Sequence, residues 1–451
     1  MKNNFLWGGS TSAFQYEGGA AEGGKGLSVY DVMKNRNYQT ASDFYHHWKE
    51  DIDLIAEMGF KAFRLSISWT RILPDGEGEI NEEGINFYIK IFKALRQRNI
   101  EPVVTLYHWD MPQSLIEKYN GWYGKEIIRA FEHYVDVCLK YFGCYVHYWL
   151  TLNEANLTKL LPTFGTGLKI QENDPEFPAL RQRVLMNTYE AHFTAVRKIH
   201  EAFPESKVGC MIASSLAYPF SPDPEDVRLT AAHNQDLTYN FLNVLTTGIQ
   251  TTTEINEMKK AGIKDIENRH KEWENKIYHI DFISFSYYFT VCIGKEQHVK
   301  NNEAETVQMM YEALKNPCLK QSTFGWTIDP IGLRILMDEL WNRYHLPLMI
   351  VENGLGVKDD VLNPDGTIHD SYRIEYLRQH IKEMKKAIDE DGVECLGYLP
   401  WGCIDLLSAS GDPDKRYGFV YVDYSDNYTR YKKDSFSWYQ KVISSNGEDL
   451  Q

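Results

Sequence analysis

The chain has 451 residues, of which 43% are hydrophobic and 25% are charged, a composition that excludes wholesale disorder and is typical of a soluble globular protein. Its net charge of −15 argues against nucleic acid and against anionic membrane surfaces as the main partners. At about 150 residues per domain, this length allows roughly three ordinary domains or one large barrel. Because no Ser-, Pro- or Gly-rich linker divides the sequence, we expect a single domain over residues 1–451.

The N-terminal stretch and the cysteines indicate the compartment. The apolar run in MKNNFLWGG is too short for the core of a signal peptide, and the longest apolar-leaning stretch, 282–294, is far below a membrane span. The seven cysteines form no CxxC pair, which predicts reduced thiols and a cytoplasmic protein. No Cys or His pair has zinc-ligand spacing, so we expect no metal. The oligomeric state stays open, a homo-oligomer included.

Short β-rich apolar runs alternate with long amphipathic runs along the whole chain. The helical patterns start after Asp43, which is predicted to cap the first of them. The strand candidates are 4–9, 60–69, 100–109, 146–153, 207–215, 279–288, 346–352 and 394–401. The later helical patterns run near 82–98, 124–142, 183–202, 331–344 and 371–390.

Eight strands that alternate with helices favour an α/β fold with a parallel sheet, and eight such strands close a (β/α)₈ TIM barrel. The alternative is a doubly wound open sheet, which would carry a GxGxxG turn after an early strand; the sequence has none. The long connections 216–278 and 289–325 are expected to form loops at the rim of the barrel.

Two glutamates stand at the ends of predicted strands, Glu154 on the fourth and Glu352 on the seventh. Chemistry in such barrels sits where strands end, and two carboxyls about 5–5.5 Å apart can perform retaining glycoside hydrolysis. One carboxylate attacks the anomeric carbon, while the other protonates the leaving oxygen and then activates water. Arg64, at the end of the second predicted strand, is a candidate cation that keeps the nucleophile ionised. Spacing alone leaves open that both glutamates are structural salt-bridge partners.

Four stretches occur in a fixed order: FLWGGSTSAFQYEGG (5–19), DFYHHWKEDIDLIAEMGFKAFRLSISWTRI (43–72), TLNE (151–154) and IVENG (350–354). Together they resemble glycoside hydrolase family 1, the family of β-glucosidases and 6-phospho-β-glycosidases, from residue 5 to about 439. The resemblance implies that Glu154 is the acid/base and Glu352 the nucleophile. It implies no cofactor, since both steps need only carboxylates and water.

The same resemblance implies the contacts to the sugar and to the leaving group. Gln15, His108 and Asn153 resemble the family's partners of the sugar hydroxyls. Tyr288 resembles the tyrosine that binds the nucleophile, and Trp326 resembles a wall of the leaving-group subsite. Trp401 resembles the aromatic floor under the sugar ring.

The segment PWGCIDLLSASGDPDKRYGFVYVD, residues 400–423, bears on the substrate. Plain β-glucosidases of the family carry a Glu-Trp pair where this chain has Ser408 and Ala409. Loss of that carboxylate removes repulsion toward an anionic 6-substituent, and Ser408, Lys415 and Tyr417 resemble the phosphate clamp of the 6-phospho enzymes. The small Ala409 resembles the 6-phospho-β-glucosidases, whereas 6-phospho-β-galactosidases carry Trp there. Ser286, where plain glucosidases tend to have Asn, also favours the phosphorylated class.

We therefore expect a retaining hydrolase of 6-phospho-β-D-glucosides that releases glucose 6-phosphate and an aglycone. The alternatives are a plain β-glucosidase, a 6-phospho-β-galactosidase, and a non-catalytic sugar-phosphate sensor on the same barrel. The sequence gives neither the natural aglycone nor the rate.

Overall fold

The protein, seen in a computed structural model, is described over residues 2, 4–33, 36–161, 165–169, 175–214, 216–264, 266–295, 311, 313–358 and 360–451. Within these ranges, eight parallel strands close a barrel in the order β1-β12-β11-β7-β5-β4-β3-β2. The closed ring confirms the TIM barrel and excludes the open sheet. The barrel strands are β1 (Leu6–Ser10), β2 (Ala62–Ser66), β3 (Glu101–Tyr107), β4 (Tyr148–Leu152), β5 (Lys207–Ala213), β7 (Phe282–Tyr287), β11 (Leu348–Asn353) and β12 (Cys395–Tyr398).

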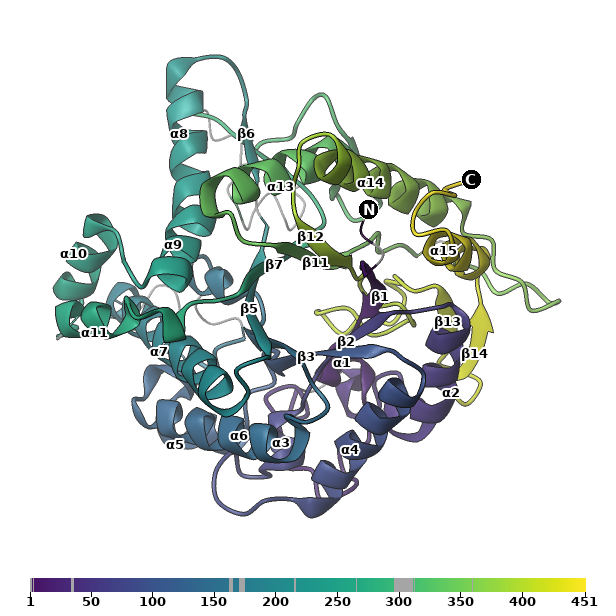
Figure 1. The fold of residues 1–451 in the computed structure, drawn as a ribbon, viewed down its shortest axis with the longest axis horizontal. Coiled ribbons are helices and arrows are strands. Elements are labelled where there is room, and N and C mark those ends of the chain that lie inside the picture. The colour runs from purple at the N-terminus through teal and green to yellow at the C-terminus, as the bar shows by residue number, and fades with distance from the viewer. Residues whose placement is uncertain are drawn as a thin grey trace.

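Helices surround the ring of strands, which occupies the centre of the view (Figure 1). They are α1 (Ala13–Tyr16), α2 (Phe44–Glu57), α3 (Trp69–Ile72), α4 (Glu82–Gln97), α5 (Gln113–Tyr119), α6 (Glu126–Phe142), α7 (Phe177–Ala202), α8 (Pro224–Asn234), α9 (Asn240–Thr247), α10 (Thr252–Lys260), α11 (Ile266–Trp273), α13 (Pro330–Tyr344), α14 (Ser371–Asp389) and α15 (Asp434–Ser444). Short strand pairs outside the barrel are β6 (Ala217–Pro219) with β8 (Val291–Ile293), β9 (Lys320–Gln321) with β10 (Thr327–Ile328), and β13 (Val420–Asp423) with β14 (Thr429–Lys432).

The barrel interior is a packed core rather than a channel. Side chains from successive strands form one buried cluster there: Ala62, Val103, Leu150, Met211, Phe282, Met349, Val351 and Leu399. A much larger cluster fills the space between the strands and the helices. This packing fixes the ring, so that polar side chains at the carboxyl ends of the strands are held on a rigid frame.

Every predicted strand overlaps an observed one, and the predicted helices are confirmed with shifted ends. The largest shift is in α7, which begins at Phe177 instead of 183. Asp43 stands at the N-cap position of α2, as predicted, but its side chain makes no capping hydrogen bond. Asp43 precedes α2 but has a left-handed backbone (φ 58°), and its side chain bonds the His46 ring at 2.7 Å instead of a helix N–H.

The expectation of a rim loop over 216–278 is wrong for most of that segment, which contains α8 to α11. Helix α9 buries an apolar face, and α10 begins with a capping box in which Thr251 and Glu254 bond each other's backbone N–H. The TxxE pattern was present in the sequence and could have predicted this helix. In the second long connection, residues 296–310 and 312 lie outside the described residues.

In the part of the chain described above, no helix combines the length and apolar character needed to cross a membrane. All seven cysteines are free thiols, of which Cys144 and Cys318 are exposed.

Candidate active site

Glu154 and Glu352 approach each other at the carboxyl ends of their strands. Glu352 lies in β11 beside an irregularity in its pairing with β7, where the register shifts between Ile350 and Glu352. Such a bulge redirects a side chain. Glu154 follows β4 by two residues and has a left-handed backbone (φ 43°), a strained conformation that is common at functional sites. Both side chains are buried.

Glu352 is held by a cation and a phenol. The Arg64 guanidinium donates to its Oε1 atom at 2.5 Å, and the Tyr288 hydroxyl donates to its Oε2 atom at 2.9 Å. Burial raises the pKa of Glu352, while these two contacts oppose that rise. Arg64 lies in the middle of β2 rather than at its end as predicted. Its long side chain covers the remaining distance.

Glu154 has a different environment. Burial, followed by the nearby charge of Glu352, raises the pKa of Glu154 to about 8. A 2.6 Å hydrogen bond from the Ser286 hydroxyl to Oε1 and the charge of Arg64 oppose the rise. Glu154 therefore holds a proton at neutral pH, while Glu352 contacts a guanidinium. This asymmetry is what a paired acid and nucleophile require.

Two further polar residues leave buried atoms without a partner. Asn153 accepts from Arg64 at 2.5 Å, but its Nδ2 atom has no hydrogen bond among the described residues. The Nδ1 atom of His108 is likewise unpaired, and burial lowers the pKa of this ring well below its usual value, so the ring is neutral. Buried polar atoms of this kind are rare unless a ligand or water satisfies them.

Gln15 and Trp401 are two further residues that the sequence predicted for the site. The Gln15 amide donates to the Leu407 carbonyl at 2.7 Å and accepts from the Ser12 hydroxyl at 2.7 Å, so its orientation is fixed. Trp401 stacks on His108 with ring centroids 5.8 Å apart. Trp401, which follows β12, therefore lies close to the strand end that carries His108. Gln15 lies in α1 next to Phe14, whose ring centroid is 5.9 Å from that of His108.

Lys415 is half-buried, and its ammonium packs on aromatic rings. Its ammonium lies 3.8 Å from the ring centroid of Trp326 and 4.3 Å from that of Phe324. Burial lowers the pKa of Lys415 to about 8. Trp326 also packs against Tyr288 at 5.2 Å, and Tyr288 binds Glu352. Aromatic contacts therefore connect the lysine to the carboxylate pair.

The other two predicted clamp residues lie on the same loop. Ser408 is buried, and its Oγ atom accepts from the Asp412 backbone N–H at 3.0 Å. The Asp412 carboxylate pairs with Lys358 at 3.1 Å, and its charge also favours the charged form of Lys415. Tyr417 is also buried, and the charge of Glu352 contributes to raising the pKa of its phenol.

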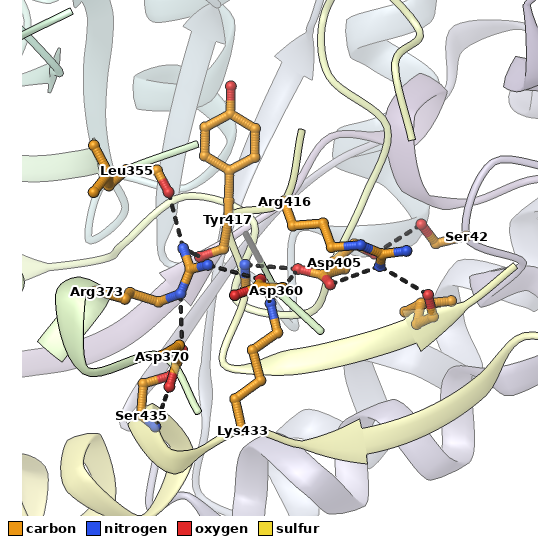
Figure 2. A network of polar contacts seen from close by, with 12 residues as sticks. Ser42, Leu355, Asp360, Asp370, Arg373, Asp405, Arg416, Tyr417, Lys433 and Ser435 are labelled. Atoms are coloured by element: carbon orange, nitrogen blue, oxygen red, sulfur yellow. Dashed lines mark hydrogen bonds and ion pairs between the residues drawn. The ribbon is translucent and has the colours of Figure 1, made fainter. Parts of the chain in front are cut away.

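Beneath this loop lies a network of buried ion pairs (Figure 2). Arg373 of α14 donates to the Leu355 carbonyl at 2.9 Å and to the Tyr417 carbonyl at 2.7 Å, so it joins the loop after β11 to the loop after β12. The Tyr417 ring points away from the network. The remaining contacts are Arg373–Asp360, Arg373–Asp370, Lys433–Asp360, Lys433–Asp405 and Arg416–Asp405.

Comparison with known proteins decides the family. Residues 1–448 match the family model described as Glycosyl hydrolase family 1. The chain belongs to glycosyl hydrolase family 1. Among family 1 relatives, it is 43% identical to an aryl-phospho-beta-D-glucosidase of Bacillus subtilis, covering 99% of this chain and 98% of the relative. It is 40% identical to a 6-phospho-beta-glucosidase of Escherichia coli, covering 99% of each.

A relative named as a plain beta-glucosidase is less similar to this chain than the two phospho-glucosidases are. Beta-glucosidase A of Thermotoga maritima is 33% identical, covering 98% of this chain and 97% of that protein. A solved structure of a beta-glucosidase from the same organism, in complex with galacto-hydroximolactam, superposes with a TM-score of 0.87 at 31% identity and covers 100% of this chain and 99% of the other. The family 1 fold is therefore shared, while the sequence lies nearer to the two phospho-glucosidases.

The resemblance to family 1 pointed to the two glutamates and to the predicted phosphate-binding residues. Three contacts around them were not predicted from the sequence. Sequence reasoning did not find the hydrogen bond from Ser286 to Glu154, the seat of Lys415 on Phe324, or the network around Arg373. Each brings together segments that are far apart along the chain, and a single sequence carries no signal for such pairings.

Proposed function

We propose that the chain hydrolyses 6-phospho-β-D-glucosides to glucose 6-phosphate and an aglycone, with retention of configuration. The observation that carries this proposal is the half-buried ammonium of Lys415. Among the described residues, no carboxylate lies within salt-bridge distance of it, and its neighbours are aromatic rings. Removing a cation from water without a directly paired carboxylate costs free energy, and an anionic substrate would supply that direct partner.

In the first step, a carboxylate oxygen of Glu352 bonds to the anomeric carbon and the glycosidic carbon–oxygen bond breaks. Glu154 gives its proton to the leaving oxygen, so the aglycone departs neutral. Arg64 and Tyr288 hold the two oxygens of Glu352 and orient it. In the second step, Glu154 takes a proton from water, the water oxygen bonds to the anomeric carbon, and Glu352 is released.

The glycone is proposed to lie over Trp401, with the unpaired atoms of His108 and Asn153 bonding its hydroxyls. Gln15 adds a polar contact at the same wall. Trp326 borders the leaving-group side. At the other end, Lys415, Ser408 and the Tyr417 hydroxyl hold the phosphate, because a dianion favours a cation together with several donors.

The relatives support phosphate over plain glucosides. The phospho-glucosidases are 43% and 40% identical to this chain, against 33% for the beta-glucosidase. Ala409 favours the gluco over the galacto epimer by its likeness to 6-phospho-β-glucosidases. The presence of both carboxylates favours an enzyme over a sensor. A single catalytic domain over residues 1–451 and a cytoplasmic location, consistent with seven free thiols, belong to this proposal.

A substrate panel tests the proposal. Nitrophenyl β-glucoside, its 6-phosphate and the corresponding galactoside 6-phosphate are compared by kcat/KM at one pH and one ionic strength. The glucoside 6-phosphate should be turned over fastest. Faster turnover of the plain glucoside would overturn the phosphate clamp, and faster turnover of the galactoside 6-phosphate would overturn the role given to Ala409.

A further inference from the structure

We propose that Ser286 is a positioning residue for the acid/base, because its hydroxyl engages Oε1 of Glu154 and leaves Oε2 to carry the proton toward the leaving group. This inference rests on the proposed function. Ser286 does not contact the reacting atoms itself; it acts through Glu154.

The position of Ser286 makes this contact specific. In the barrel, Ser286 of β7 is the direct neighbour of Glu352 in β11 and of Ala213 in β5. From there its Oγ atom donates to Oε1 of Glu154 at 2.6 Å. The side chain is buried, so water does not compete for the hydroxyl. One serine thus stands beside the proposed nucleophile and binds the proposed acid.

A comparison within the same strand shows that this bond is not a general feature of β7. Ser284 lies two residues earlier and is also buried, but its hydroxyl donates to the backbone carbonyl of Cys210. Such a contact satisfies the serine locally. The Ser286 hydroxyl is directed instead past the neighbouring strand β5 to Glu154, which follows β4.

The hydrogen bond determines which carboxyl oxygen is protonated. A serine hydroxyl has one proton, and a donated bond to Oε1 favours the form of neutral Glu154 in which Oε1 is the carbonyl oxygen. The acid proton then lies on Oε2. In the first step this proton moves to the glycosidic oxygen as the bond to the anomeric carbon breaks, and in the second step Oε2 takes a proton from water. Ser286 neither gains nor loses a proton.

The same bond affects the proton affinity of Glu154. Burial and Glu352 favour the neutral form, whereas Ser286 and Arg64 favour the ionised form. Burial raises the pKa of the Tyr288 and Tyr311 phenols, and the charge of Glu154 contributes to both shifts. If the Ser286 hydroxyl is removed, a donor to the carboxylate is lost while the opposing contributions remain. The pKa of Glu154 should therefore rise.

Ser286→Ala tests the proposal, with Ser286→Thr as the variant that keeps the hydroxyl and Ser284→Ala as the matched control from the same strand. Their kcat/KM values are compared on dinitrophenyl, nitrophenyl and phenyl β-glucoside 6-phosphates. For Ser286→Ala, we expect a loss of about tenfold to a hundredfold on the phenyl substrate, whose leaving group needs the proton most. The dinitrophenyl substrate should lose less than about twofold, because its leaving group departs without acid assistance.

The pH profile provides the second readout. In Ser286→Ala, the basic limb of kcat/KM for the phenyl substrate should move to higher pH, while Ser286→Thr and Ser284→Ala keep the wild-type limb. Equal losses on all three leaving groups with an unmoved basic limb would overturn the proposal and assign Ser286 a structural role. A failure of the proposed function would look different from a failure of this inference. In that case the wild-type enzyme itself would show no preference for the phosphorylated substrates.

Discussion

Two clusters of buried charge lie at the same end of the barrel, and they differ in how completely their charges are paired. In the network around Arg373, Asp360 binds Arg373 and Lys433, and Asp405 binds Lys433 and Arg416. In the candidate active site, Glu154 has a raised pKa, and the buried Nδ1 of His108 and Nδ2 of Asn153 have no partner in the described part of the chain.

The difference separates a structural role from a functional one. A fully paired ionic network can hold a loop in one conformation, and this one fixes the backbone of Tyr417 through Arg373. A site that leaves polar atoms unpaired keeps them available for a substrate, at a cost in stability that the surrounding packing offsets. Variants in the ion-pair network should therefore lower the free energy of unfolding, whereas variants in the candidate active site should lower activity.

Glu352→Gln should have the largest effect. Removal of the nucleophile should lower kcat on nitrophenyl β-glucoside 6-phosphate by roughly four orders of magnitude or more, with little change in melting temperature. Glu57→Gln, which removes an exposed carboxylate paired with Lys432, is the control and should keep full activity. Mass spectrometry should find a fluoro-sugar phosphate bound to Glu352 in wild-type enzyme. Retained activity in Glu352→Gln would mean that another residue is the nucleophile.

Arg373→Met should damage the fold first. It leaves two buried aspartates each with one partner fewer, and removal of one member of a buried ion pair costs about 3–5 kcal/mol of unfolding free energy. Denaturant unfolding measures the loss. Arg378→Met, on the same helix but partly exposed, should stay within about 1 kcal/mol of wild type. If Arg373→Met is as stable as Arg378→Met, the network does not support the loop.

Lys415→Met should affect the phosphorylated substrate alone. The lost charge-assisted contact is worth about 2 kcal/mol, which corresponds to roughly thirtyfold in kcat/KM. The plain glucoside should react at its wild-type rate. Lys320→Met, an exposed lysine on the neighbouring β9–β10 hairpin, serves as the control. Equal losses on both substrates would show that Lys415 acts on the fold of the site instead of on the phosphate.

The smallest effect concerns pH. Glu154 and Lys415 both have a pKa of about 8, so each is protonated and competent below that pH. Above it, loss of the Glu154 proton should lower kcat/KM for either substrate by about tenfold per pH unit. Loss of the Lys415 charge should lower only the value for the phosphorylated one. The preference for phosphate should therefore decline above about pH 8, and a preference that does not change there would contradict the role of Lys415.

Much of the fold and the site could be predicted from the sequence. The alternation of apolar and amphipathic runs predicted the barrel because strand and helix periodicities are local properties of a chain. The TLNE and IVENG motifs located Glu154 and Glu352 by resemblance. The helices within 216–278 were missed although Thr251 and Glu254 carried a capping signal, since the segment was interpreted by its length rather than by its pattern.

What the sequence determined by itself is the order of the elements, the places of Glu154 and Glu352 next to the ends of barrel strands, and the absence of a carboxylate at 408–409. Only the tertiary structure decided that Ser286 binds Glu154, that Lys415 rests on Trp326 and Phe324, and that Arg373 ties two loops together. The physical reason is that periodicity and motifs depend on neighbours along the chain. Hydrogen bonds and ion pairs depend on the closure of the barrel, which brings residues more than 100 positions apart within contact distance.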